Sequence, residues 1–174
     1  MAVYYLDTSA VLKRYRTEKG SDVVTELYEA RAVGDSLMTS HFTCLEVESV
    51  AARALKGRVL TQHAYEALLG AFARDLTEHL YLLPLAGSLV NEAIYAARRH
   101  AVRAPDAIHV ASAERTNRDS PNDFVFVASD LELLSAAEAA GVETFNPEAE
   151  GAIELLREWR KPSNGFTLPD ARSR

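Results

Sequence analysis

Short apolar runs alternate with longer stretches of helical periodicity along the chain. The first apolar run, AVYYL at 2–6, is rich in β-branched and aromatic residues and predicts a buried strand. Runs of the same kind predict further strands at 36–40, 79–85, 123–129 and 142–147. Because helical stretches separate these strands, the pattern predicts an α/β fold with a central parallel sheet.

Residues that favour helix ends mark the predicted helices. Thr8 or Ser9 is placed to cap the first helix, Thr61 caps a later one, and Gly57 ends the helix before it. Pro105 suits the first turn of a helix, where its missing N–H would lack a partner anyway. The predicted helices cover 9–15, 21–32, 42–55, 61–76, 88–100, 105–116 and 131–140.

The length of 174 residues fits one domain with a sizeable core. We place that domain at 1–147. Residues 148–174 differ in character and form a C-terminal extension. They predict an amphipathic helix with Ile153, Leu156 and Trp159 on one side, followed by a turn-rich, loose tail.

Composition narrows the possible functions. No apolar run approaches the roughly 20 residues of a membrane span, and the N-terminus lacks a signal-peptide pattern, so we expect a cytoplasmic protein with no membrane partner. The single cysteine, Cys44, excludes an intrachain disulfide and a zinc site of cysteine pairs. The net charge of −6 argues against a nucleic-acid coat protein but not against a nuclease, since clustered metal-binding acids lower the net charge.

Acidic residues stand where a parallel sheet would gather them. Asp7 and Asp130 directly follow predicted strands, and the carboxyl ends of such strands form the sites of α/β folds near a topological switch point. Asp106 lies in the first turn of a helix, and Glu46 lies one turn into another. We therefore expect these acids, from separate segments, to face one cleft.

Clustered carboxylates repel one another in a cleft, so either their pKa values rise or a cation fills the gap. Hard oxygen ligands favour Mg²⁺ or Mn²⁺, and phosphodiester hydrolysis is the natural chemistry of such a site. Each acid also has a structural explanation. Asp106 and Asp130 would stabilise a helix N-terminus by about 0.3–1 kcal/mol, and Asp7 would serve as a helix cap.

The segments around these acids resemble the motifs of the PIN-domain family, and within it the VapC-like toxin ribonucleases of toxin–antitoxin pairs. YYLDTSAVLKRY resembles the opening strand with its acid, Asp7, and TCLEVESVAAR the helix with the second acid, Glu46. RAPDAIHVASA resembles the third motif, with Asp106. FVFVASDLELLSAAEAAGVETFNP resembles the closing strand and helix, with Asp130. The likeness covers residues 2–147.

The resemblance implies a three-layer α/β/α fold and Mg²⁺- or Mn²⁺-dependent endoribonuclease activity that leaves 5′-phosphate and 3′-hydroxyl ends. It also implies a homodimer held by a VapB-like antitoxin, with RNA as the substrate. One position departs from the family pattern. The last motif often has a threonine two residues before the acid, and Ala128 stands there instead.

Further residues are candidates for supporting roles. The resemblance suggests that the Ser9 hydroxyl holds the acids or a water, with helix capping as the structural alternative. His109 lies on the same helical face as Asp106, so it is either an acid–base group or a hydrogen-bonded histidine beside the site. Candidate phosphate contacts, or simply solvated helix ends, are Lys13, Arg14, Arg16, Arg53, Lys56, Arg58, Arg98, Arg99, His100 and Arg103.

Other functions remain as alternatives. A haloacid-dehalogenase-type phosphohydrolase also places an aspartate after its first strand, but it needs a second aspartate two residues later, where this chain has Ser9. A dinucleotide-binding enzyme would need a glycine-rich loop after the first strand, and none follows here. A PIN-like scaffold that binds RNA or an antitoxin without cleavage is the non-enzymatic alternative.

Overall fold

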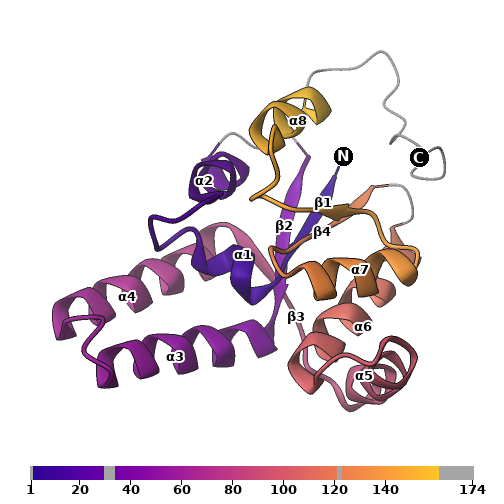
Figure 1. Ribbon diagram of the computed structural model, residues 1–174, viewed down its shortest axis with the longest axis horizontal. Coiled ribbons are helices and arrows are strands. Elements are labelled where there is room, and N and C mark those ends of the chain that lie inside the picture. The colour runs from indigo at the N-terminus through magenta and orange to yellow at the C-terminus, as the bar shows by residue number, and fades with distance from the viewer. Residues whose placement is uncertain (1, 30–33, 121–122, 161–174) are drawn as a thin grey trace.

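The computed structural model describes residues 2–29, 34–120 and 123–160, and a parallel sheet lies at its centre (Figure 1). The five predicted strands are all present, each within about two residues of its expected bounds. They are β1 (Val3–Leu6), β2 (Ser36–Ser40), β3 (Leu80–Leu83), β4 (Phe124–Val127) and β5 (Thr144–Phe145). Their order across the sheet is β3-β2-β1-β4-β5, and every neighbouring pair is parallel.

The predicted helices are also confirmed, including the one beyond residue 147. The helices are α1 (Thr8–Leu12), α2 (Ser21–Glu29), α3 (His41–Lys56), α4 (Gln62–Glu78), α5 (Gly87–His100), α6 (Ala104–Asp119), α7 (Leu131–Ala139) and α8 (Ala152–Trp159). Thr61 caps α4 and Gly57 follows α3, as the sequence indicates. The predicted end of the second helix, near residue 32, lies outside the described residues.

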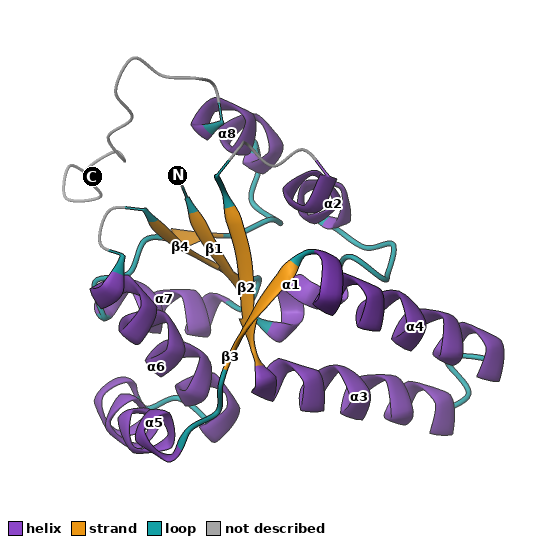
Figure 2. Cartoon of the chain, turned by 180° about the vertical axis from the view of Figure 1, so that it is seen from behind, coloured by secondary structure: helices purple, strands orange, loops and turns teal. Residues whose placement is uncertain are grey.

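The sheet is covered by helices on both faces, so the three-layer α/β/α fold is confirmed. Successive residues of β1 point to opposite faces. Tyr4 and Leu6 pack with apolar side chains of α1, α2, α3, α4 and α8. Tyr5 packs with side chains of α5, α6 and α7 on the other face. Figure 2 shows the α3–α4 hairpin projecting on one side of the sheet, with α5, α6 and α7 on the other.

The order of the strands places a topological switch point at β1. The chain runs from β1 through β2 to β3 on one side and then returns to place β4 and β5 on the other. The ends of β1 and β4 are joined beyond the ladder, because the Asp7 N–H donates to the Val127 carbonyl at 3.0 Å. Because β1, β2 and β4 are parallel, the helices that follow them, α1, α3 and α7, begin at the same carboxyl end of the sheet.

The C-terminal extension packs into the same core as the rest of the chain. Leu156 is fully buried within the cluster that contains Tyr4 and Leu6. Arg157 forms a bidentate ion pair with Glu26 of α2, at 2.8 and 2.7 Å. The described part of the chain contains no helix long and apolar enough to span a membrane. A separate unit beginning at residue 148 remains a prediction. In the structure, α8 packs beside α2 in the same helical layer.

We predict that Leu156→Ala lowers the free energy of unfolding by about 2–5 kcal/mol, since it leaves a cavity in a packed core. The neighbouring Leu155 is 40% exposed and provides a matched control. Denaturant unfolding of both variants checks this. Equal losses for Leu155→Ala and Leu156→Ala would mean that α8 is not part of the core.

Candidate active site

Asp7 is both the residue that follows β1 and the N-cap of α1. Its Oδ1 accepts hydrogen bonds from the Ala10 N–H and the Ser9 hydroxyl, each at 2.8 Å. The prediction that Thr8 or Ser9 caps this helix is therefore wrong. Asp7 has the extended backbone of an N-cap residue, and its side chain accepts the capping hydrogen bond from the Ala10 N–H. Burial raises the pKa of Asp7, while the nearby His109 and these hydrogen bonds oppose the rise.

Ser9 joins the first and last motifs of the chain. Its hydroxyl donates to Asp7 and accepts from the Ser129 N–H at 3.0 Å. The predicted role of Ser9 in holding an acid has a geometric basis here, since one hydroxyl contacts the carboxylate after β1 and the backbone after β4.

Glu46 lies in the second turn of α3 with its Oε2 turned toward two donors. The Thr8 hydroxyl donates to this oxygen, and the His109 Nε2 lies 2.9 Å from it. Burial raises the pKa of Glu46, but the hydrogen bonds from His109 and Thr8 outweigh it, so the net shift is downward. Glu46 is thus held as a carboxylate. By contrast, Glu48 of the same helix is exposed, as expected for a surface acid.

His109 is buried on α6, and both of its ring nitrogens have partners. The Nδ1 lies 3.0 Å from the Tyr5 hydroxyl and the Nε2 contacts Glu46. The ring also packs edge-on against Tyr5 and Phe42, with centroids 6.0 and 6.1 Å away. In the structure His109 is thus a buried, hydrogen-bonded histidine next to Glu46. Its position between Tyr5 and Glu46 could not be read from the sequence, because the contacts join β1, α3 and α6.

Asp106 and Asp130 lie at the N-termini of α6 and α7. Asp106 accepts a hydrogen bond from the Arg103 Nε at 3.0 Å. Asp130 is exposed and caps α7, and its Oδ1 accepts from the Glu132 and Leu133 N–H groups at 2.9 and 3.2 Å. The hydrogen bond to Asp106 raises the pKa of Arg103, and the charge of Asp130 adds to this rise.

The four predicted acids have different partners. Thr8, the residue after Asp7, donates to Glu46, which also contacts His109. Asp106 pairs with Arg103, and Asp130 caps α7. Among the residues that the structure describes, no group of three or more His, Cys, Asp or Glu side chains is placed to hold a metal ion. A single metal site of four carboxylates stays a prediction.

Comparison with known proteins decides the family, since residues 4–139 match the PIN domain. The chain belongs to the PIN-domain family. Two Mycobacterium tuberculosis relatives, Ribonuclease VapC45 (strain CDC 1551 / Oshkosh) and Ribonuclease VapC49 (strain ATCC 25618 / H37Rv), are each 30% identical over 144 residues, which covers 81% of this chain and 93% of theirs. The haloacid-dehalogenase and dinucleotide-binding alternatives are thereby excluded.

Solved structures bear out the fold of this PIN domain. The structure of VapBC2 from Rickettsia felis, bound to a DNA fragment from its promoter, contains a chain that superposes with a TM-score of 0.59 at 11% identity. The match covers 83% of this chain and 98% of that one. FitAcB from Neisseria gonorrhoeae gives the same TM-score at 18% identity, covering 83% of this chain and 97% of that one. At these identities the likeness concerns the fold alone.

Ala128 occupies the position where PIN domains of this type often have a threonine. Its side chain is fully buried in the cluster formed with α5, α6 and α7. The hydroxyl of Ser9 reaches across from α1 and accepts a hydrogen bond from the Ser129 N–H at this strand end. Ala128 therefore offers no polar side chain at the end of β4. The hydrogen bond from the Ser129 N–H to Ser9 holds this end of the strand.

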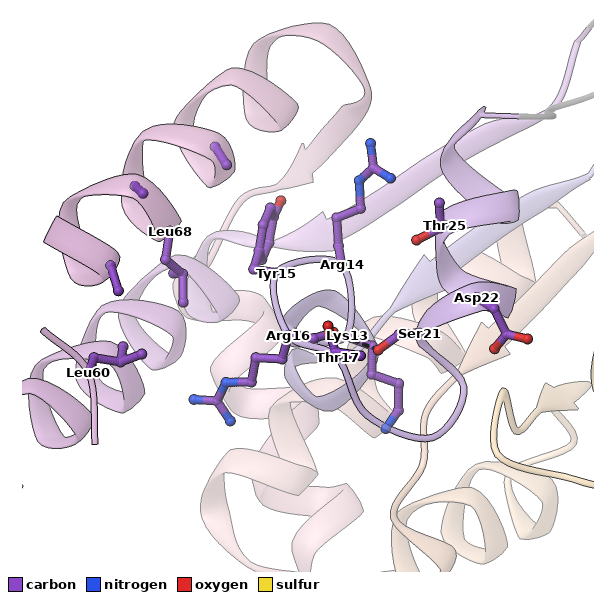
Figure 3. Close-up of a pocket in the computed structure, with 13 residues that line it drawn as sticks. Lys13, Arg14, Tyr15, Arg16, Thr17, Ser21, Asp22, Thr25, Leu60 and Leu68 are labelled. Atoms are coloured by element: carbon purple, nitrogen blue, oxygen red, sulfur yellow. Dashed lines mark hydrogen bonds between the residues drawn. The ribbon is translucent and has the colours of Figure 1, made fainter. Parts of the chain in front are cut away.

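The basic residues that follow α1 differ from the exposed cations that the sequence suggests. Lys13 is buried and pairs with Glu18 and Glu148, at 3.2 and 2.5 Å. Arg14 pairs with Glu29 at 3.0 Å and also contacts Asp75. In Figure 3 the side chains of Lys13, Arg14 and Arg16 diverge around a pocket of about 640 Å³ between the α1–α2 segment and α4. Lys13 and Arg14 are thus engaged by acids of the same chain.

The other predicted phosphate contacts remain on the surface. Arg53, near the end of α3, is exposed, and its positive charge contributes to the lowered pKa of Glu46. Arg99 is exposed and lies 3.4 Å from Glu114. Arg103 is exposed and pairs with Asp106 at 3.0 Å. Arg53 and Arg103 are therefore the cations that the structure relates directly to the candidate acids.

We predict that Asp7→Asn keeps or raises the melting temperature in EDTA at pH 7. Asparagine caps helices as well as aspartate and retains the accepting Oδ1. Because the pKa of Asp7 is raised on folding, its contribution to stability is lost as the pH rises through the folded-state value. The advantage of the variant should therefore grow from pH 4 to pH 7.

Thermal melts across this pH range check the prediction. Asp22→Asn changes the net charge by the same amount at an exposed site and serves as the control. A variant at Asp7 that is less stable than the unsubstituted chain at every pH would contradict the assigned effect of burial.

Proposed function

We propose that this PIN domain is a metal-dependent endoribonuclease, the VapC-type toxin of a toxin–antitoxin pair. Family membership supports it, as do two relatives that carry the name ribonuclease and align over 93% of their length. The observation that carries the proposal is the proximity of Asp7 and Glu46 beside the topological switch point, since Thr8, the residue after Asp7, donates a hydrogen bond to Glu46.

The donor set fits a hard divalent cation, Mg²⁺ or Mn²⁺, because every candidate ligand atom is a carboxylate oxygen. The hydrogen bonds from Ser9 and Ala10 fall on Oδ1 of Asp7, and those from Thr8 and His109 fall on Oε2 of Glu46. We assign Oδ2 of Asp7 and Oε1 of Glu46 to the cation. Asp106 and Asp130 complete the set, directly or through water.

When bound, such a cation polarises a phosphoryl oxygen and lowers the pKa of a water that attacks the phosphodiester. The chain itself orients the carboxylates and binds the substrate. Arg103, exposed and paired with Asp106, would bind an RNA phosphate, and Asp106 would then be available to hold the cation. Arg53 and Arg99, both exposed, contact further phosphates, and each contact adds a salt-dependent increment of affinity.

The partner that we propose is a VapB-like antitoxin encoded beside this chain, because the chain shares its fold with a protein of the VapBC2 complex from Rickettsia felis. A homodimer accompanies this proposal. The second candidate function is a scaffold that binds RNA or the antitoxin without cleavage. Two observations favour it: Ala128 at the threonine position, and the lack of a ready-made metal-binding group among the described residues.

We predict that the purified chain cleaves RNA with Mg²⁺ or Mn²⁺ and not with EDTA. Glu46→Gln should lower the cleavage rate by about 100-fold or more. Substitution of a residue that only supports a metal ligand already lowers activity by up to about 100-fold, and Glu46 is proposed to be a ligand itself. Glu48→Gln makes the same chemical change on an exposed position of the same helix and should leave the rate unchanged. A gel assay with 5′-end analysis measures both.

The outcomes separate the candidate functions. Cleavage that persists in EDTA, or a Glu46→Gln variant as active as Glu48→Gln, would overturn the metal mechanism. Binding of RNA without cleavage by the unsubstituted chain, at every metal tested, would favour the scaffold.

We predict that the small protein encoded beside this chain copurifies with it and suppresses cleavage. Binding to the folded state alone should raise the melting temperature of the complex above that of the free chain, by mass action. Coexpression, light scattering and thermal melting check this. A neighbour that leaves both cleavage and melting temperature unchanged would contradict the assigned partner.

A further inference from the structure

A buried tyrosine places its hydroxyl behind the candidate site. Tyr5 lies in the central strand and is fully buried against the α5–α7 layer. Its hydroxyl lies 3.0 Å from Nδ1 of His109. On the far side of the same ring, Nε2 lies 2.9 Å from Oε2 of Glu46. Three side chains from β1, α6 and α3 thus form one chain of hydrogen bonds that ends on a carboxylate of the site.

The chemistry of the two ends fixes the direction of these hydrogen bonds. An ionised carboxylate only accepts, so Nε2 of His109 must carry the proton that points to Glu46. In a neutral ring Nδ1 is then an acceptor, and the Tyr5 hydroxyl is the donor that satisfies it. The opposite tautomer would place the lone pair of Nε2 against the carboxylate of Glu46. The hydroxyl of Tyr5 therefore favours the tautomer that donates to Glu46.

Close packing restricts the orientation of the His109 ring. His109 is only 2% exposed and is flanked edge-on by Tyr5 and Phe42. A buried Nδ1 without a partner is unfavourable, so loss of the Tyr5 hydroxyl would favour a rotated or mobile ring. Thr8 donates to the same Glu46 oxygen, so the orientation of this carboxylate depends on two donors.

We propose that Tyr5 is a positioning residue of the active site: through His109 it holds Oε2 of Glu46 and thereby leaves Oε1 to hold the cation. The inference rests on the proposed function, in which Glu46 is a ligand of the cation. Neither Tyr5 nor His109 touches substrate in this arrangement. Both act on the cation through Glu46, as partners behind a metal ligand commonly do.

The experiment removes one hydroxyl and measures cation binding rather than cleavage. We expect Tyr5→Phe to weaken Mn²⁺ binding in calorimetry by about 10–100-fold, the usual effect of losing a supporting residue. Tyr4→Phe is the matched control, since Tyr4 is the adjacent, equally buried tyrosine and faces the opposite layer. We expect it to bind Mn²⁺ as the unsubstituted chain does.

A double-mutant cycle separates positioning from a general loss of stability. In His109→Gln the amide nitrogen replaces the donor to Glu46 without needing Tyr5, whereas His109→Leu removes the donor. We expect His109→Gln to retain most of the Mn²⁺ affinity that His109→Leu loses. We also expect Tyr5→Phe to have little further effect on affinity in the His109→Gln background, because the two positions act in series.

The nitrogen shifts of the His109 ring give a readout that needs neither metal nor RNA. The proton is expected on Nε2 in the unsubstituted chain, and this signature should change in Tyr5→Phe. Unaltered Mn²⁺ affinity in Tyr5→Phe, additive effects in the cycle, or a proton on Nδ1 would each overturn this inference alone. Failure of the unsubstituted chain to bind Mn²⁺ or cleave RNA would overturn the proposed function and, with it, the role of Tyr5 at a cation.

Discussion

The pairing of β1 with β2 on one side and β4 on the other is the constraint on which the rest of the structure depends. Tyr4 and Tyr5 are buried on opposite faces of this one strand, so β1 ties both helical layers to the sheet. The strand ends where Asp7 bonds to the Val127 carbonyl and turns directly into α1. A shift of β1 by one residue would exchange its faces and move Asp7 out of the switch point.

Asp7 is subject to two opposing demands: burial favours its neutral form, whereas binding of a cation would need its charged form. The raised pKa of this carboxyl means that folding disfavours its charge, while binding of a cation requires that charge. Ser9 and the Ala10 N–H offset part of the loss through hydrogen bonds to one oxygen. In the proposed function a bound cation would offset the rest, so metal binding and folding would stabilise each other. Without the cation, the burial of Asp7 lowers stability at a position that the proposed function requires.

The sequence predicted local structure well because each element carries its own signal. The FVFV run of β4 and the proline at the start of α6 act within a few residues, and both elements appear where expected. The cap of α1 was misassigned because Asp7, Thr8 and Ser9 are all good caps, and only the backbone decides among them. Pairings over long distances carry no such signal. The bond from Tyr5 to His109 spans 104 positions, and its geometry arises only when α6 packs on β1.

The same reasoning explains why Lys13 looked like a surface cation in the sequence. Its partner Glu148 lies 135 positions away, in the segment after β5. The same stretch packs closely against the segment between α1 and α2, because a Cβ on Gly20 would stand 2.7 Å from the Pro147 carbonyl oxygen, and Gly20 also has a φ of +80°. Lys13 is the C-cap of the short helix whose N-cap is Asp7. The ion pair of Lys13 with Glu148 therefore ties the start of the C-terminal extension to the end of α1 opposite Asp7, and so helps to hold the helix that Asp7 caps.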